Sequence, residues 1–269
     1  FKSVKSSDSN MSFIICDSTT HKLVDVVRDR KSYNLKQYFH RFEPKTRFKV
    51  KTISIDMYLP YIQLIKEMFP NAKIIIDPFH IVQALNRELN RTRVRVMNQY
   101  RYKDAKLYRK LKYYWKLILK NPNELQNYKY NRYKLFESFI TSKGIVDYIL
   151  ENNTSLKNDY EVVHSLRECI QDRDYIEFKE TIEAATQLDL SPGLKRVLKT
   201  LSTYLPYIQN TCEYPTRTNG PIEGINNKIK VLKRNAYGFR NYYHFRNRII
   251  LITKMFGTKQ KGIKQQLVA

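Results

Sequence analysis

The first 80 residues alternate between short apolar runs and amphipathic segments. Four apolar runs predict β-strands, over residues 11–17, 22–27, 48–55 and 72–76. The first two runs are separated by a short polar turn, which is typical of an antiparallel hairpin. Apolar positions at helical spacing predict helices over 34–42 and 58–69. Because the last two strands are separated by a helix, they are predicted to form a parallel βαβ unit.

From residue 81 the pattern changes to long segments rich in Leu, Tyr, Lys, Arg and Glu. No convincing strand occurs up to residue 214, so this stretch is predicted to be mostly helical, with breaks at residues 121–123 and 191–193. A last helix is expected to start near Asn219 or Gly220, since either residue can cap a helix and Pro221 suits the first turn. The predicted fold is α/β (α+β), with three parts: 1–80, 81–215 and 216–269.

The charge of the chain indicates a polyanionic partner. The 269 residues include 49 Lys and Arg against 25 Asp and Glu, a formal net charge of +24. Residues 216–269 alone hold seven Lys and five Arg against one acid, Glu223, which gives +11. Binding to phosphates releases counterions and explains such an excess, whereas a small-molecule enzyme does not need it. We therefore predict a nucleic-acid partner and no small-molecule substrate.

Aromatic residues accompany the basic ones. The chain has 21 Tyr, and its single tryptophan, Trp115, lies in the basic and aromatic run 112–116. Rings interleaved with cations can stack on bases while the cations neutralise phosphates. The alternative for Trp115 is packing in a helical core, and the alternative for the run as a whole is a solvated basic surface.

Cysteine usage and hydropathy exclude two further classes of protein. The three cysteines lie far apart and form no CxxC pair, which argues against a zinc ribbon and against a disulfide framework. No apolar run approaches 18 residues, so no membrane helix is predicted. We expect a cytoplasmic protein. The chain begins with Phe1 and not with Met, which we interpret as the start of a fragment.

Carboxylates mark the candidate chemistry. Asp56 follows a predicted strand, where active-site groups of α/β folds collect, although such an Asp can also cap a helix or belong to a turn. Glu223 lies in the first turn of the last helix, where the helix dipole alone would favour it. Asn227 lies one turn further on the same face. Carboxylates over a basic surface suit divalent metal ions that act on phosphodiesters.

Asp77 and His80 form an Asp-x-x-His pair directly after the strand that ends at Ile76. His80 could position a scissile phosphate or orient Asp77. A structural histidine at a strand end is the alternative. No Cys lies near the pair, and it lacks zinc-site spacing of its own.

Three segments resemble the ISL-three family of insertion-sequence transposases: 13–39, 53–89 and 218–250. The motifs are Asp-Met-Tyr at 56–58, Phe-Pro-Asn-Ala at 69–72, Asp-x-Phe-His at 77–80 and Asn-Gly-x-x-Glu-Gly-x-Asn at 219–226. The resemblance implies a ribonuclease-H-like core with a DDE triad, in which Asp56 matches the second acid and Glu223 the third. It also implies a large all-helical insertion domain over 81–215, metal catalysis with Mg²⁺ or Mn²⁺, and DNA partners at the element ends and target.

The family pattern places its first catalytic Asp on a strand before Phe1, so we predict that the chain alone neither cleaves nor joins DNA. Asp17 ends the next strand and is not expected to replace it. The competing hypotheses are an inactive remnant that binds only DNA or intact transposase, and an RNA-binding helical protein. We expect a homo-oligomer on DNA, contacted by residues after Glu223 and by Trp115. The contact residues after Glu223 are Asn227, Lys228, Lys230, Lys233, Arg234 and Arg240.

Overall fold

The structure is a computed structural model that describes residues 1–4 and 11–255. The chain divides into two compact units. The split unit combines Phe1–Ile74 with Arg217–Ala269, and the helical unit is Ile75–Thr216. The dividing line falls inside a β-strand, so each unit is described separately below.

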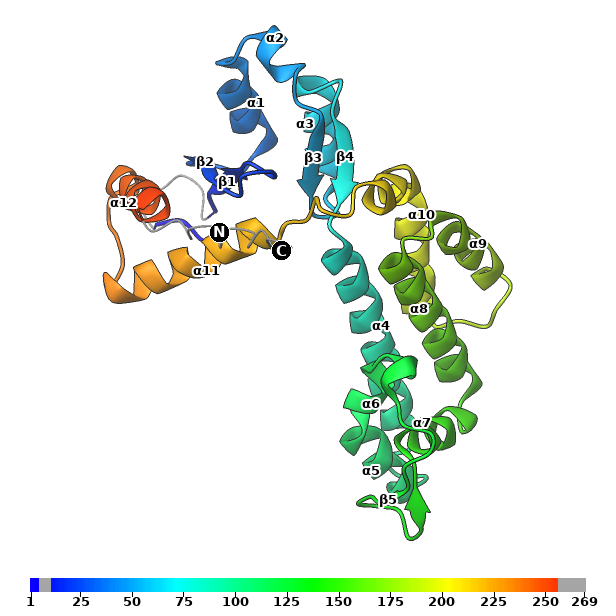
Figure 1. Ribbon diagram of the computed structural model, residues 1–269. Helices are drawn as coiled ribbons and strands as arrows, with labels where there is room; N and C mark the ends of the chain where they lie inside the picture. Colours follow the sequence, from blue (N-terminus) through cyan, green and yellow to red (C-terminus); the bar gives the residue numbers. More distant parts are fainter. Residues whose placement is uncertain (5–10, 256–269) are drawn as a thin grey trace, which may run out of the picture. The chain divides into compact units, whose positions relative to one another are not determined.

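The split unit contains the strands and the first and last helices of the chain (Figure 1). Its elements are β1 Phe13–Cys16, β2 Leu23–Val27, α1 Ser32–His40, α2 Pro44–Arg47, β3 Thr52–Ile55, α3 Leu59–Met68, the start of β4 Lys73–Ile76, α11 Gly220–Asn235 and α12 Tyr242–Met255. Strands β1 and β2 pair antiparallel, with Phe13 opposite Val27 and Ile14 opposite Val26. The predicted hairpin is confirmed.

Strands β3 and β4 form a second two-stranded sheet. The N–H of Lys73 donates to the carbonyl of Lys51 at 2.9 Å, which joins the starts of the two strands and makes them parallel. β3 is shorter than the predicted strand over 48–55, and the first half of that prediction was wrong. The N–H groups of Phe48 and Val50 donate to Pro44 and Arg47, so the turns that follow α2 occupy this backbone.

The core of the split unit packs helices α11 and α12 against the β1–β2 hairpin. Its fully buried centre is Phe245, whose neighbours in the core include Val26, Ile225, Ile229 and Ile249. The spacing of Ile225 and Ile229 by four residues puts both on one face of α11. That face points into the core, which leaves the opposite face of α11 to solvent.

Asp25 on β2 joins α1 and α12 to the hairpin. Its carboxylate accepts a hydrogen bond from the Tyr38 hydroxyl at 2.8 Å and pairs with the Arg246 guanidinium. Burial opposes ionisation of Asp25, but the hydrogen bonds from Tyr38, Val26 and Arg246 outweigh it and lower the pKa of this carboxyl. Burial and the same carboxylate raise the pKa of Tyr38 to about 12. Asp25 is therefore ionised and Tyr38 is neutral at neutral pH.

The helical unit is built around three long helices, α4, α8 and α10, which pack against one another directly or through α9 (Figure 1). Its elements after the end of β4 are α4 Pro78–Gln99, α5 Ala105–Tyr113, α6 Trp115–Leu119, the 3₁₀ turn η1 Pro122–Glu124, β5 Asn131–Arg132, β6 Phe139–Ile140, α7 Ser142–Glu151, α8 Thr154–Asp172, α9 Tyr175–Ala185 and α10 Pro192–Glu213. The prediction that this stretch is mostly helical is confirmed.

Both predicted breaks are helix starts. Asn121 caps η1 by accepting a hydrogen bond from the N–H of Asn123, and Ser191 caps α10 by accepting one from the N–H of Leu194. Proline follows each cap at the first helical position, where its missing N–H costs nothing. The Asn-Pro and Ser-Pro pairs therefore mark ends of one helix and starts of another.

One expectation for this unit was wrong, because a small hairpin lies within it. In that hairpin Arg132 is opposite Phe139 and Asn131 opposite Ile140, and the loop that joins the strands runs from 133 to 138. Each strand has only two residues, too few for an alternating pattern to be recognised in the sequence.

The mixture of helices with two-stranded sheets agrees with the predicted α+β class. Within residues 1–4 and 11–255 the strands form three separate two-stranded sheets, and the ribonuclease-H-like core stays a prediction. None of the helices in this described part of the chain is long and apolar enough to cross a membrane.

Candidate functional site at the ends of strands β3 and β4

Asp56 is the first residue after β3, and its side chain is exposed. One carboxylate oxygen, Oδ1, accepts a hydrogen bond from Nδ2 of Asn219 at 2.7 Å. The two residues are 163 positions apart in the sequence, so the bond depends on the folding of the split unit. Asn219 therefore fixes the orientation of the Asp56 carboxylate.

Three further hydrogen bonds fix the segment that leads into α11. The Ser54 hydroxyl on β3 donates to the carbonyl of Arg217 at 3.3 Å. The Arg217 guanidinium donates to the hydroxyls of Ser18 and Thr19, in the turn between β1 and β2. Residues 217–219 are thereby held along the end of β3, and α11 starts directly after Asp56's partner, Asn219.

Asn219 occupies the N-cap position of α11 but makes no side-chain cap bond there. We expected it or Gly220 to cap the helix. Its amide is directed to Asp56 instead, since a charged acceptor binds an amide donor more strongly than a neutral one does. Asn219 is therefore a residue of the site that sequence reasoning had treated as a helix cap.

Glu223 lies in the first turn of α11, where its N–H donates to the carbonyl of Asn219 at 3.1 Å. Its side chain is exposed, as are those of Asn227, Lys228, Lys230 and Arg234. Ile225 and Ile229 bury the other face of the helix. Glu223 is thus presented on the solvent face of the helix that follows Asn219.

Asp77 directly follows β4 and caps α4. Its Oδ1 accepts a hydrogen bond from the N–H of Phe79 at 3.1 Å, and the residue is 3% exposed. His80 lies one turn into the helix and its N–H donates to the Asp77 carbonyl. The Asp-x-x-His spacing therefore results from one capped helical turn, with the second carboxylate oxygen of Asp77 outside the cap.

Each unit offers ligand groups for a divalent metal ion. Asp56 and Glu223 belong to the split unit, whereas Asp77 and His80 belong to the helical unit. Carboxylate oxygens are the ligands that Mg²⁺ and Mn²⁺ prefer.

Two other predicted residues have structural partners. The ammonium of Lys233 donates to the carbonyls of Lys2 and Ser3 at 3.0 and 3.1 Å, and burial lowers its pKa. Lys233 therefore fastens the N-terminal segment, whereas Lys230 is exposed. Asp17 accepts hydrogen bonds from Thr19 and Thr20, and those from Thr20 are the main reason that its pKa is lowered.

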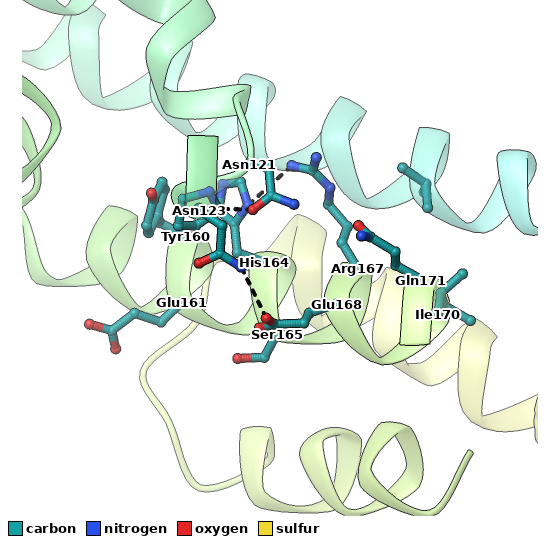
Figure 2. A pocket seen from close by; sticks show the side chains of 12 residues that line it. Asn121, Asn123, Tyr160, Glu161, His164, Ser165, Arg167, Glu168, Ile170 and Gln171 are labelled. Atoms are coloured by element: carbon teal, nitrogen blue, oxygen red, sulfur yellow. Dashed lines mark hydrogen bonds between the residues drawn. The ribbon is translucent and has the colours of Figure 1, made fainter. Parts of the chain in front are cut away.

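A cavity of about 350 Å³ lies elsewhere, within the helical unit. Figure 2 shows its polar lining, in which Asn123 from η1 donates to Glu168 of α8 at 3.2 Å. Arg167 donates to the carbonyl of Leu119 and to Nδ1 of His164, at 3.0 and 3.1 Å. These side chains satisfy the C-terminal carbonyls of α6, so the lining has a structural use.

His164 in this cavity is a fixed neutral imidazole. Its Nε2–H donates to the carbonyl of Ile118 at 3.0 Å, while Nδ1 accepts from Arg167. Burial lowers the pKa of His164 from 6.5 to about 4, and the nearby Arg167 charge acts in the same direction. With both nitrogens engaged, His164 is unsuited to act as a general base.

The low pKa of His164 predicts acid destabilisation of the helical unit. An unfolded histidine binds a proton below pH 6.5, whereas the folded one stays neutral down to about pH 4. The free energy of unfolding should therefore fall as the pH falls through this window, by about 2 kcal/mol at pH 5. Denaturant titrations followed by Trp115 fluorescence measure this, because the single tryptophan lies in the helical unit.

The matched variant is His164→Gln, which is neutral at every pH and should flatten the dependence. His244→Gln changes an exposed histidine of the split unit and should leave the pH dependence of the unfolding free energy as in the parent. Equal pH slopes for the parent and His164→Gln would contradict the assignment.

The chain is similar to known proteins over much of its length. The ISL-three family model, described as a transposase, matches residues 1–249. The chain is 28% identical to the transposase for insertion sequence element IS1001 of Bordetella parapertussis over 234 residues, 86% of this chain and 54% of that protein. It is 35% identical over 130 residues to a Lactococcus lactis subsp. lactis protein named "ATP-dependent protease", which covers 48% of this chain and 40% of that protein.

The chain therefore spans about half the length of the curated relatives it matches. No solved structure gives a significant match. The family model covers most of the chain, whereas the relative named as a protease covers less than half, so the family match carries more weight.

Proposed function

The chain belongs to the ISL-three family of transposases, and from this premise we propose that it forms the catalytic core of a DDE transposase with a ribonuclease-H-like fold. The proposed reaction is divalent-metal-dependent cleavage of insertion-sequence DNA and its joining to a target. One observation carries the proposal: Asp56 is bound by Asn219, so the split unit brings this acid to the start of the helix that carries Glu223.

The residues present fit a divalent metal. Asp56 and Glu223 of the split unit offer hard carboxylate oxygens, and in the helical unit Asp77 offers another while His80 adds an imidazole. When bound, such an ion activates the attacking oxygen and stabilises the leaving oxygen of a phosphodiester. Asn219 orients Asp56, and the Asp77 cap on α4 fixes the direction of its carboxylate. These contacts preorganise the ligands before DNA arrives.

Basic residues of α11 are suited to hold the DNA backbone. Lys228, Lys230 and Arg234 are exposed on the helix that carries Glu223, and Arg240 follows it. Each phosphate contact of this kind makes the affinity for duplex DNA fall as salt rises. The logarithm of the binding constant falls by about 0.9 per contact for each tenfold rise in salt concentration. We propose Lys228, Lys230, Arg234 and Arg240 as phosphate contacts, together with Asn227.

Iron-mediated cleavage of the protein backbone tests the metal site without requiring DNA cleavage. Fe²⁺ substitutes for Mg²⁺ at oxygen-rich sites, and ascorbate with peroxide then generates radicals that cut the nearby backbone. We expect cuts close to Asp56, Asp77 and Glu223, mapped by mass spectrometry and suppressed by excess Mg²⁺. The parent chain is compared with Asp56→Asn and with Asp17→Asn, a control that removes an acid already bound in a turn.

Loss of the cuts in Asp56→Asn but not in Asp17→Asn supports the site. Scattered cuts that Mg²⁺ does not suppress would contradict it. A chain that binds DNA in a salt-dependent way but shows no metal site would be an inactive remnant.

Asn219→Ala tests the positioning role of this residue. Removal of the amide leaves the Asp56 carboxylate without its fixed hydrogen bond, and loss of such an orienting partner lowers metal affinity by roughly 10–100-fold. Titration with Mn²⁺, followed by electron paramagnetic resonance, measures the affinity. Asn227→Ala removes an exposed amide two turns along α11 and serves as the control. Equal Mn²⁺ affinities in Asn219→Ala and the parent would contradict the role.

A further inference from the structure

Charge is unevenly distributed within the helical unit. Residues 100–140, which we name the tip segment, hold eleven Lys and Arg against three Asp and Glu, a net charge of +8. Residues 141–216 hold eight against twelve, a net charge of −4. Figure 1 shows α5, α6 and β5 of the tip segment gathered at one end of α4. A polyanion is therefore attracted to this end of the unit.

Helix α5 gives the tip segment a basic face. Leu107 and Leu111 bury one side of the helix. The other side carries a row of exposed side chains. Arg109 lies three or four residues from each of the others, so they share one face of the helix. The row consists of Lys106, Arg109, Lys112 and Tyr113. Within this row, the only recorded ion pair among described residues joins Lys106 to the exposed Glu137 at 3.8 Å. Such an exposed ion pair contributes little to stability, so a phosphate can readily replace the Glu137 carboxylate.

The small hairpin is fastened to the C-terminal end of α5. The Tyr114 hydroxyl donates to the carbonyl of Lys134, and the Tyr114 ring centroid lies 5.8 Å from that of Phe136. The Lys134 ammonium lies 5.6 Å from the centroid of the Tyr113 ring. In the hairpin itself, exposed Arg132 is paired with Phe139, which is 68% exposed. Cations and rings of the two elements thus form one surface.

Six aromatic residues of the tip segment are exposed. They are Tyr102, Tyr113, Trp115, Tyr128, Tyr130 and Phe139. The interpretation of Trp115 as a core residue was wrong, since it is 39% exposed. Aromatic rings beside cations stack on unpaired bases, each stack contributing about 1–3 kcal/mol. A duplex hides its base faces, so these rings would gain nothing from it.

We propose that the tip segment binds an unpaired DNA strand, with the α5 cations on the phosphates and the exposed rings on the bases. The identity of the nucleic acid as DNA rests on the proposed function. The surface belongs to the helical unit alone and shares no residue with the acids that follow β3 and start α11.

Fluorescence anisotropy of labelled single-stranded and duplex oligonucleotides tests the proposal with the whole chain. The charge variant combines Lys106→Ala, Arg109→Ala and Lys112→Ala, and the aromatic variant combines Tyr128→Leu, Tyr130→Leu and Phe139→Leu. The charge variant loses three cations, each of which contributes about 0.7 to the slope of log affinity against log salt concentration for a single strand. This salt slope should therefore be smaller in magnitude by about 2. The aromatic variant should weaken single-strand binding by roughly tenfold or more and leave duplex binding unchanged. Quenching of Trp115 fluorescence gives a second readout.

A matched control combines Lys195→Ala, Arg196→Ala and Lys199→Ala, three exposed cations on α10 of the same unit. It should bind single strands like the parent. Parental single-strand affinity in the aromatic variant would overturn base stacking, and a parental salt slope in the charge variant would overturn the interface. The charge and aromatic variants both keep Asp56, Asp77 and Glu223, so failure of the metal site leaves this test decisive.

Discussion

Replacement of Asp56 by Asn is expected to weaken Mn²⁺ binding by roughly 100-fold or more, since loss of a partner that only orients a metal ligand already costs about 10–100-fold. The substitution keeps the shape of the side chain but removes its negative charge. The new amide oxygen can still accept the hydrogen bond from Asn219, yet it binds a divalent cation far more weakly than a carboxylate does. Titration with Mn²⁺, followed by electron paramagnetic resonance, measures the loss.

Asp56 is exposed, so this loss should occur without unfolding. Surface substitutions usually change stability by no more than about 0.5 kcal/mol. Asp17→Asn is the matched control, because its acid also follows a strand of the split unit but accepts hydrogen bonds from its own turn. Equal Mn²⁺ affinities in Asp56→Asn and the parent would remove Asp56 from the proposed metal site.

Replacement of Phe245 by Ala is expected to destabilise the split unit by about 3–5 kcal/mol. The ring is fully buried between the β1–β2 hairpin and α11, and its centroid lies 4.8 Å from that of Phe239. Truncation leaves a cavity in the contact that orients α11. A loss of this size is a large share of the stability of a typical domain.

Hydrogen–deuterium exchange measures this effect unit by unit. Amides of β2, α11 and α12 should exchange faster in Phe245→Ala, while those of α8 in the helical unit should be little changed. Tyr243→Ala provides the control, since Tyr243 is 60% exposed on the same helix. Unchanged protection of α11 in Phe245→Ala would contradict the assigned core.

Local patterns in the sequence were sufficient for most elements of the split unit. The strands of the β1–β2 hairpin and β4 are short apolar runs, and α3 has apolar positions that repeat with the period of a helix. The two-residue strands β5 and β6 have no such repeat, and the hairpin was missed. The strand predicted over 48–55 failed in its first half because turns after α2, set by Pro44, occupied the backbone there.

The candidate acids were identifiable because their positions are local features too. Asp56 and Asp77 each follow a strand, and Glu223 lies in a first helical turn. Their partners were not identifiable. Nothing in the local sequence distinguishes an Asn219 that caps its own helix from one that binds Asp56.

The sequence by itself determined the order of the strands in the first 80 residues, the mostly helical middle, the basic helix that carries Glu223 and the family. Only the tertiary structure decided that Asn219 binds Asp56, that Lys233 holds the N-terminal carbonyls from 231 positions away, and that the rings of the tip segment face solvent. The physical reason is the range of the interactions. Periodicity and capping act within a few residues, whereas hydrogen bonds and exposure depend on which distant segments the packed core brings together.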